Sequence, residues 1–216
     1  MRLPENLLTE EPHAALFDLD GVLIDSETLY TRFWSEIERR YPTGIEDFAH
    51  VIKGNTLSRI LDTYYPDEEL RRKVVADLKA FEAGMQYEIF EGVLDYFDRL
   101  DRAGWKKAIV TSSNPEKMER LFTQLPQLKE RVDVVITDKD VTRSKPDPEG
   151  YQLAAARLGC KPADCIVYED SLAGLSAGNA AGCAVVALAT TLPAERLHGK
   201  AHLVVSNLSE VPVPKP

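Results

Sequence analysis

The sequence predicts an α/β protein with a three-layer core built on a parallel sheet and an all-helical domain inserted into it. Short apolar runs alternate with amphipathic segments along most of the chain, which is typical of parallel α/β sheets. A block of roughly 70 residues without a strand separates the first two runs, and an ordinary strand-to-helix connection is far shorter. The 216 residues suffice for one substantial core with an inserted module.

The expected strands of the core are the short apolar runs. They span residues 14–17, 108–111, 132–137, 165–168 and 184–188, and residues 203–205 add an edge strand. Helix signals lie between them: Asn114 followed by Pro115 predicts an N-cap and a first helical residue. The same kinds of signal recur downstream, with starts at Asp147–Pro148 and Ser171 and ends at Gly159 and Gly182.

The inserted block is predicted to be helical because its apolar residues recur at helical spacing. Leu29, Phe33 and Ile37 form one apolar stripe. A second stripe lies between the start signal Asp67 and the stop signal Gly84, and consists of Leu70, Val74, Leu78 and Phe81. We therefore expect residues 1–21 and 93–216 to form the core and residues 22–92 to form a helical cap domain.

Composition restricts the partners and the compartment. The net charge of −9 argues against nucleic acid or an anionic membrane as a partner, because either needs a basic surface. No stretch approaches the ~18 apolar residues of a membrane span, and the first residues lack the apolar run of a signal peptide. Cys160, Cys165 and Cys183 have no metal-ligand spacing and are interpreted as reduced, buried thiols. The chain is expected to be cytoplasmic and, by default, monomeric.

Four elements with reactive side chains follow predicted strands, and they should meet because ligands in open α/β sheets bind at the carboxyl ends of the strands. Asp18 and Asp20 follow the first strand. Two carboxylates at this spacing can share a hard cation, or one can attack while the other transfers protons. The simpler alternative is an Asp-Gly turn that only ends the strand.

The second element offers groups for an anion. Thr111, Ser112 and Ser113 place hydroxyl and backbone N–H groups at a helix N-terminus, where phosphate oxygens bind, although they could also serve only as a cap. In the third element, Lys145 precedes Pro146 in a stiffened segment. It is a candidate phosphate clamp, with a solvated surface charge as the alternative.

The fourth element, Glu169 and Asp170, places two adjacent acids at a strand end. Adjacent acids repel one another unless a cation or a helix N-terminus compensates, and Asp170 could also merely cap the next helix. Taken together, the four elements predict a cation site beside an anion site. That combination suits phosphoryl transfer, in which positioning and charge neutralisation supply most of the catalysis.

In four segments the sequence resembles the haloacid dehalogenase-like hydrolase superfamily, on the branch of β-phosphoglucomutase and many sugar-phosphate phosphatases. These segments are FDLDGVLIDSE, VTSSN, SKPDP and YEDSLAGLSAGNAAG, in the family's order and spacing. The resemblance covers nearly the whole chain. It implies a Rossmann-like core with a helical cap inserted after the first strand.

The resemblance also implies residue roles. Asp18 would be the nucleophile, Asp20 the general acid and base, and Thr111 and Lys145 would hold the transferring phosphoryl group. The implied cofactor is Mg²⁺, which prefers oxygen ligands. Its implied ligands are Asp18, the backbone carbonyl of Asp20 and Asp170, with Glu169 in support.

The expected activity is hydrolysis of a small phosphate monoester, with a sugar phosphate as one candidate, through an aspartyl-phosphate. Relatives that cleave carbon–halogen or carbon–phosphorus bonds lack an aspartate at the position of Asp20, so the resemblance favours phosphate esters. In the cap, Lys53 and Gly54 resemble the substrate loop of β-phosphoglucomutase and are candidate substrate contacts, although Lys53 could be merely exposed.

Two alternatives to hydrolysis remain. The first is a hexose-phosphate mutase of the β-phosphoglucomutase type, but Leu57 and Tyr30 stand where that mutase has an arginine and a histidine. The second is a non-catalytic module that binds a phosphorylated metabolite, and such a module is expected to lack a residue of the reactive set. The set is complete in this chain, so a phosphatase is the preferred interpretation.

Overall fold

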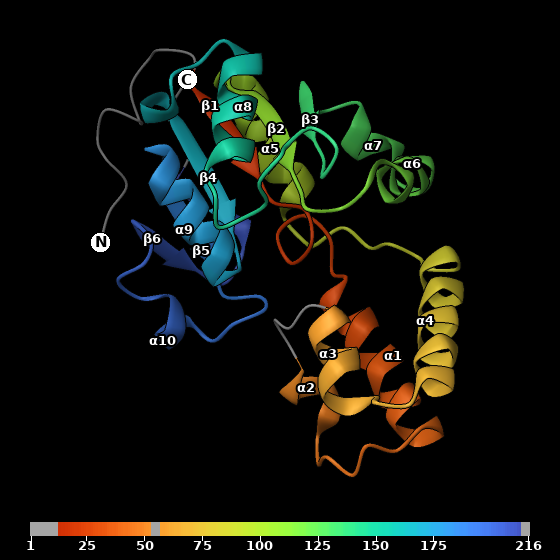
Figure 1. Ribbon diagram of the computed structural model, residues 1–216. Helices are drawn as coiled ribbons and strands as arrows, with labels where there is room; N and C mark the ends of the chain where they lie inside the picture. The colour runs from red at the N-terminus through yellow and green to blue at the C-terminus, as the bar shows by residue number, and fades with distance from the viewer. Residues whose placement is uncertain (1–12, 53–56, 213–216) are drawn as a thin grey trace. The chain divides into compact units, whose positions relative to one another are not determined.

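A six-stranded parallel sheet is the main element of the structure, a computed structural model that describes residues 13–52 and 57–212 (Figure 1). The strand order is β3-β2-β1-β4-β5-β6. The strands are β1 (Ala14–Phe17), β2 (Lys106–Val110), β3 (Val134–Ile136), β4 (Cys165–Glu169), β5 (Ala184–Leu188) and β6 (Leu203–Val205). The predicted α/β class with a Rossmann-like parallel sheet is confirmed. The first, fifth and sixth strands match their predicted bounds, and the others shift slightly at their ends.

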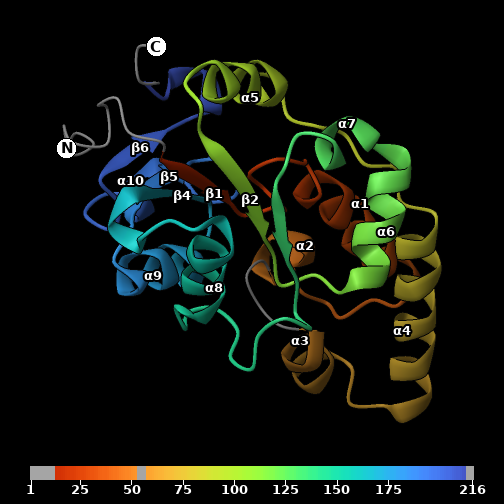
Figure 2. The same cartoon turned by 90° about the horizontal axis from the view of Figure 1, so that it is seen from above.

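Helices cover both faces of this sheet, which makes the core a three-layer structure. Figure 2 shows α8 (Glu149–Leu158) and α9 (Leu172–Ala181) on one side of the strands and α5 (Val93–Arg102) on the other. Successive residues of a strand point to opposite faces. In β1, Leu16 therefore belongs to the cluster beneath α8 and α9, whereas Phe17 packs on Phe97 of α5 at 5.1 Å between ring centroids. Both faces of the sheet are thus covered by apolar packing, as parallel sheets require.

The remaining elements complete the core. They are α6 (Pro115–Gln124), α7 (Pro126–Lys129), α10 (Ala194–Leu197) and two 3₁₀ turns, η2 (Pro162–Asp164) and η3 (Leu208–Glu210). The predicted start of α6 is confirmed, because Asn114 accepts a hydrogen bond from the Lys117 backbone N–H at 2.8 Å. Ser171 caps α9 in the same way, and Gly182 ends that helix in the left-handed region. Within the described part of the chain, no helix combines the length and the apolar character needed to cross a bilayer.

One predicted helix start was wrong by a residue. Asp147 was expected to be the N-cap of α8, with Pro148 as its first helical residue. Pro148 is the N-cap instead, because its carbonyl accepts the backbone N–H of Gln152 at 3.0 Å. Asp147 still binds the helix start, since its side chain accepts the Glu149 N–H at 3.0 Å.

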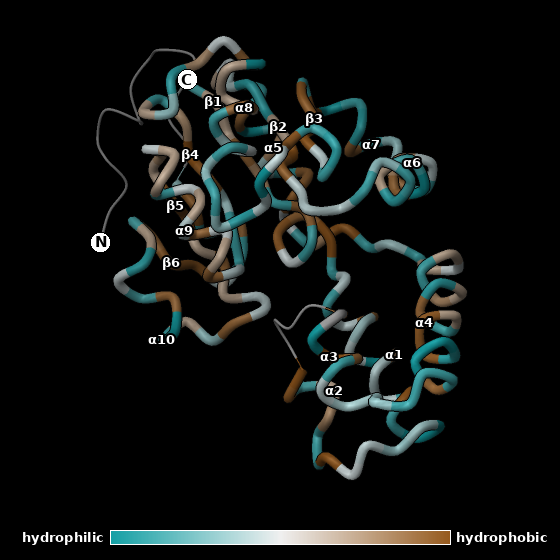
Figure 3. The backbone as a smooth tube through the Cα atoms, viewed as in Figure 1, coloured by the Kyte–Doolittle hydropathy of each residue, from teal (hydrophilic) through white to brown (hydrophobic). Residues whose placement is uncertain are grey.

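The chain divides into two compact units, one of residues Ser26–Gln86 and the other of the remaining residues. The smaller unit consists of α1 (Glu27–Arg40), α2 (Phe48–Val51), α3 (Leu57–Tyr64) and α4 (Glu68–Ala83). Its own apolar cluster joins Phe33 and Ile37 of α1 to Val74 and Leu78 of α4. Figure 3 shows the pattern behind this packing, with hydrophobic and hydrophilic residues interspersed along α4. The function of this unit as a cap stays a prediction.

Candidate active site

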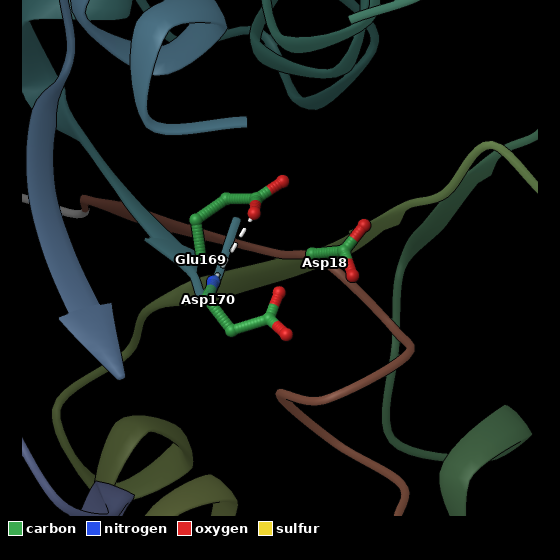
Figure 4. A group of neighbouring side chains, drawn as sticks. All are labelled: Asp18, Glu169 and Asp170. Carbon is green, nitrogen blue, oxygen red and sulfur yellow. Dashed lines mark hydrogen bonds between the residues drawn. The ribbon is translucent and has the colours of Figure 1, made fainter. Parts of the chain in front are cut away.

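Three buried acids lie together where β1 and β4 end. Phe17 and Tyr168 are register partners in these neighbouring strands, so Asp18 comes next to Glu169 and Asp170 (Figure 4). Each of the three offers a carboxylate oxygen, and these oxygens all lie within 4.8 Å of one another. β1 and β4 flank the point where the strand order of the sheet reverses, which is where open α/β sheets bind ligands.

This acidic group is electrostatically crowded. Burial raises the pKa of Asp18 well above its usual value, and the charges of Glu169 and Asp170 add to this effect while Lys145 opposes it. Burial and the charge of Glu169 also raise the pKa of Asp170 to about 7. Buried carboxylates of like charge need a cation to remain ionised together. Because every donor is an oxygen, the group fits a hard divalent ion such as Mg²⁺.

Lys145 is the positive charge that the protein itself places at this site. Its ammonium donates hydrogen bonds to the Asp18 carboxylate, to Glu169 at 2.7 Å and to the Val110 carbonyl at 3.0 Å. Burial alone would lower the pKa of Lys145, but the charges of Asp18 and Glu169 outweigh burial and raise it. Lys145 therefore stays an ammonium beside Asp18, where it can neutralise an anion.

Glu169 fixes that lysine in place. Its buried carboxylate also accepts hydrogen bonds from the Tyr151 hydroxyl at 2.8 Å, the Ser171 hydroxyl at 2.9 Å and the backbone N–H groups of Asp170 and Ser171, both at 3.1 Å. Burial would raise the pKa of Glu169, but Lys145 and these hydrogen bonds lower it. Glu169 is thus an ionised junction, held by groups from β4, α8 and the start of α9.

The predicted hydroxyl group lies at the end of β2, the neighbour of β1 on its other side. Thr111 is buried, and its backbone N–H binds the Ile136 carbonyl at 3.0 Å. Its hydroxyl accepts the Ser113 backbone N–H at 3.0 Å. Ser112 is exposed beside it. Thr111 and Ser112 border a pocket of about 170 Å³ that is also lined by Ser144 and Lys145.

The Asp20 carboxylate does not belong to the group of three buried acids and binds other residues. Both of its carboxylate oxygens accept hydrogen bonds from the Lys117 ammonium at 2.7 Å, and the Ser113 hydroxyl donates to one of them at 3.2 Å. The sequence predictions did not include Lys117. A usable signal existed, because Lys117 is the third residue of a helix whose cap, Asn114, follows the predicted anion-binding hydroxyls.

Gly21 permits the close packing between the Asp20 turn and the metal candidates. Its φ is +81°, a left-handed conformation that side chains rarely adopt. A Cβ at this position would lie 2.0 Å from a carboxylate oxygen of Asp170. The glycine of the Asp-Leu-Asp-Gly segment is therefore required both by its backbone conformation and by the carboxylate beside it.

The structure thus brings most of the predicted site residues to one edge of the sheet. Asp18, Glu169, Asp170 and Lys145 are in direct contact or close proximity, and Thr111 directly follows the neighbouring strand β2. The side chain of Asp20 is bound on the α6 side. Lys53 and Gly54 lie outside the described residues. The roles of all these residues in binding and catalysis stay predictions.

Comparison with known proteins gives a consistent set of matches. The family model for haloacid dehalogenase-like hydrolases matches residues 12–182. Validoxylamine A 7'-phosphate phosphatase of Streptomyces hygroscopicus subsp. limoneus is 32% identical, over 91% of this chain and 94% of the relative. Hexitol phosphatase A of Escherichia coli is 31% identical, over 93% of both chains.

Two further matches bear on fold and activity. A β-phosphoglucomutase of Mycobacterium bovis is 28% identical, over 94% of this chain and 93% of the relative. A crystal structure of a hydrolase of the same superfamily from Deinococcus radiodurans, with bound phosphate and sodium, superposes with a TM-score of 0.75. Its sequence is 25% identical, and the match covers 94% of each chain.

Proposed function

The chain belongs to the haloacid dehalogenase-like hydrolase family, and from this we propose that it is a Mg²⁺-dependent phosphatase acting on a small phosphate monoester. One observation carries the proposal. The Asp18 carboxylate lies beside the Lys145 ammonium and within 4.8 Å of carboxylate oxygens from Glu169 and Asp170. This arrangement joins a nucleophile, an anion clamp and a cation site.

In the proposed mechanism, the Asp18 carboxylate forms a bond to phosphorus while the bond from phosphorus to the leaving oxygen breaks. Asp20 gives its proton to that oxygen, so the product leaves as an alcohol. Water then attacks the phosphorus of the aspartyl-phosphate and gives a proton to Asp20, which frees Asp18 and inorganic phosphate. Lys145 and Thr111 hold the phosphoryl oxygens in both steps.

The metal requirement rests on the donor set. Asp18, Asp170 and the backbone carbonyl of Asp20 would hold Mg²⁺, and Glu169 would support the site through Lys145 and the start of α9. When bound, the ion neutralises negative charge on the phosphoryl group. The raised pKa values of Asp18 and Asp170 support this assignment, because both acids are buried beside like charges that a cation would neutralise.

We propose a phosphorylated sugar or polyol as the substrate class. The two phosphatases with the highest identity given above are named for a validoxylamine phosphate and for hexitol phosphates. We further propose that residues 22–92 act as a cap that selects the alcohol part of the substrate, with Lys53 and Gly54 among its contacts.

The proposal is tested by phosphate release from a panel of phosphorylated sugars, polyols and other metabolites, with Mg²⁺ and after chelation. We expect Mg²⁺-dependent release from at least one sugar or polyol phosphate. Absence of release from every compound, including p-nitrophenyl phosphate, would contradict a phosphatase. Release that persists unchanged after exhaustive chelation would contradict the metal requirement alone.

A mutase is the second candidate, favoured by the match to a β-phosphoglucomutase. The resemblance to the β-phosphoglucomutase branch places Tyr30 where the mutase of that branch has a histidine, and the Tyr30 hydroxyl donates to Glu82 at 3.0 Å within the helical unit. Incubation with β-glucose 1-phosphate and a trace of glucose 1,6-bisphosphate separates the two activities. Glucose 6-phosphate forms only if the protein is a mutase, and we expect free phosphate instead.

A further inference from the structure

The Asp20 carboxylate is held on both oxygens by groups from the start of α6. Lys117 reaches both oxygens at 2.7 Å, and the Ser113 hydroxyl reaches one of them at 3.2 Å. Only 14% of the Lys117 side chain is exposed, compared with 30% of the Asp20 side chain. A lysine that is this enclosed and binds both oxygens differs from an exposed surface ion pair, which fixes little.

The same segment also positions the predicted phosphoryl-binding hydroxyl. Ser113 donates its backbone N–H to the Thr111 hydroxyl at 3.0 Å and its side-chain O–H to Asp20. Asn114 then caps α6 by accepting the backbone N–H of Lys117 at 2.8 Å. The cap at Asn114 therefore fixes the backbone that carries the Lys117 ammonium. Asn114 itself lies three residues after Thr111.

Asp20 and the metal candidates lie on opposite sides of β1. Lys117 and Ser113 follow β2, whereas Glu169 ends β4 and Asp170 follows it, and β1 lies between these two strands. The next residue, Gly21, faces the other way, since a Cβ there would meet Asp170. Proton transfer is thus placed on the β2 side of Asp18, and the cation site on the β4 side.

We propose that Lys117 is a positioning residue that keeps the Asp20 carboxyl group on the β2 side of Asp18, within reach of the leaving oxygen. This inference rests on the proposed phosphatase function. Asp20 lies beyond the end of β1, and both Lys117 and Ser113 bind its carboxylate. Lys117 binds both oxygens and so restricts rotation of the carboxyl group, and it acts on the reaction only through Asp20.

The inference predicts a dependence on the leaving group. The leaving oxygen of an alkyl phosphate must be protonated as the phosphorus–oxygen bond breaks, because an alkoxide is strongly basic. p-Nitrophenolate is a weak base and leaves without a proton. The value of kcat/KM reports the steps up to release of the alcohol. Misplacement of Asp20 should therefore lower kcat/KM for an alkyl phosphate and hardly affect kcat/KM for p-nitrophenyl phosphate.

The experiment compares Lys117→Met, Lys117→Arg, Asp20→Asn and the double variant Asp20→Asn/Lys117→Met. The substrates are p-nitrophenyl phosphate and the best alkyl phosphate of the metabolite panel. Lys129→Met, at an exposed position in α7, is the matched control. Circular dichroism and the melting temperature establish that each variant is folded.

We expect Lys117→Met to lower kcat/KM for the alkyl phosphate by about 10- to 100-fold, part of the effect of a general acid. The change for p-nitrophenyl phosphate should stay within about threefold, and Lys117→Arg should recover most of the alkyl rate. Because Lys117 acts through Asp20, the double variant should be no slower than Asp20→Asn.

Equal losses on both substrates, or a loss that adds in full to that of Asp20→Asn, would overturn the positioning role and leave the phosphatase intact. A Lys117→Met variant as active as Lys129→Met would also overturn it. Wild-type protein that releases phosphate from neither substrate would overturn the proposed function together with this inference.

Discussion

At the scale of single residues, Asp18 bears the most direct test of the chemistry. Asp18→Asn should abolish turnover, because an amide cannot form the aspartyl-phosphate that the mechanism requires. The variant should remain folded, since the change removes one charge from a buried group of three acids. Phosphate release and the melting temperature without metal measure the two effects. Turnover near the wild-type level would remove Asp18 from the role of nucleophile.

Substitution of Gly21 can separate the effect of close packing against Asp170 on activity from the effect of backbone strain on stability. Gly21→Ala should cost about 1–2 kcal/mol in the left-handed region and also push the new methyl group into the Asp170 carboxylate. Gly182→Ala is the matched control, because its φ is +85° and its Cβ would meet nothing within 4 Å. We expect both variants to lose stability in denaturant unfolding, but only Gly21→Ala to lose Mg²⁺-dependent activity. Similar activity in both would contradict the clash with Asp170.

The sequence was sufficient to predict that Asp18, Glu169 and Asp170 lie together. Each acid ends or follows an apolar run, and parallel strands bring such positions to the same edge. The place of Lys117 in the first turn of α6 marks it as a neighbour of the predicted anion-binding hydroxyls, but it does not identify Asp20 as its partner. Its contact with Asp20 depends on how α6 is rotated about its axis, and that rotation is set by packing of Met118 and Leu121.

At the scale of elements, the interface between α5 and β4 contains a buried hydroxyl pair. Tyr96 and Tyr168 are joined at 2.6 Å between their oxygens. Tyr168→Phe should destabilise the protein by about 1–3 kcal/mol, because it leaves the buried Tyr96 hydroxyl without this partner. The double variant Tyr96→Phe/Tyr168→Phe should regain much of the loss, since neither polar atom remains.

Denaturant unfolding of the wild type, both single variants and the double variant gives the coupling energy of this pair. Additive losses would show that the hydroxyl groups do not act together. Activity should be little changed in the folded variants, because neither hydroxyl contacts the acid group directly.

Among both strands and helices, some bounds were predicted correctly and others were shifted. The bounds of β1 and β5 follow from uninterrupted apolar runs, so sequence and structure agree there. The start of α8 was off by one residue because Asp147 and Pro148 both fit the first turn, and composition alone does not tell which carbonyl accepts the first helical hydrogen bond.

At the scale of the whole molecule, metal binding should be visible as stability. A ligand at 100 times its Kd stabilises the folded state by about 2.7 kcal/mol. For a chain of this length that corresponds to a rise in Tm of about 5–10 °C. We expect Mg²⁺ to raise the Tm by this order and chelation to reverse it.

Asp170→Asn should abolish most of that rise, because it removes a predicted ligand and relieves the crowding among the acids. Glu130→Gln changes an exposed acid outside the site and is the control. An equal rise in Asp170→Asn and wild type would place the ion elsewhere. The measurement is differential scanning fluorimetry with and without a chelator.

The division of the chain into two units has a simple sequence origin. Residues 26–86 contain helical apolar stripes that close on each other, so this segment has a core of its own. Substrate choice could not be predicted, because it depends on how individual side chains of residues 22–92 are arranged, and apolar periodicity does not encode that.

The hydrogen bonds of Glu169 link the position of Lys145 in the site to the packing of α8 and α9. Tyr151 of α8 and Ser171 at the start of α9 both bind the carboxylate that holds Lys145. Natural selection on the packing of these two helices against the sheet therefore also acts on the position of the Lys145 ammonium. Substitutions at the residues that pack α8 and α9 against the sheet should consequently alter turnover among homologues, even when every reactive side chain is unchanged.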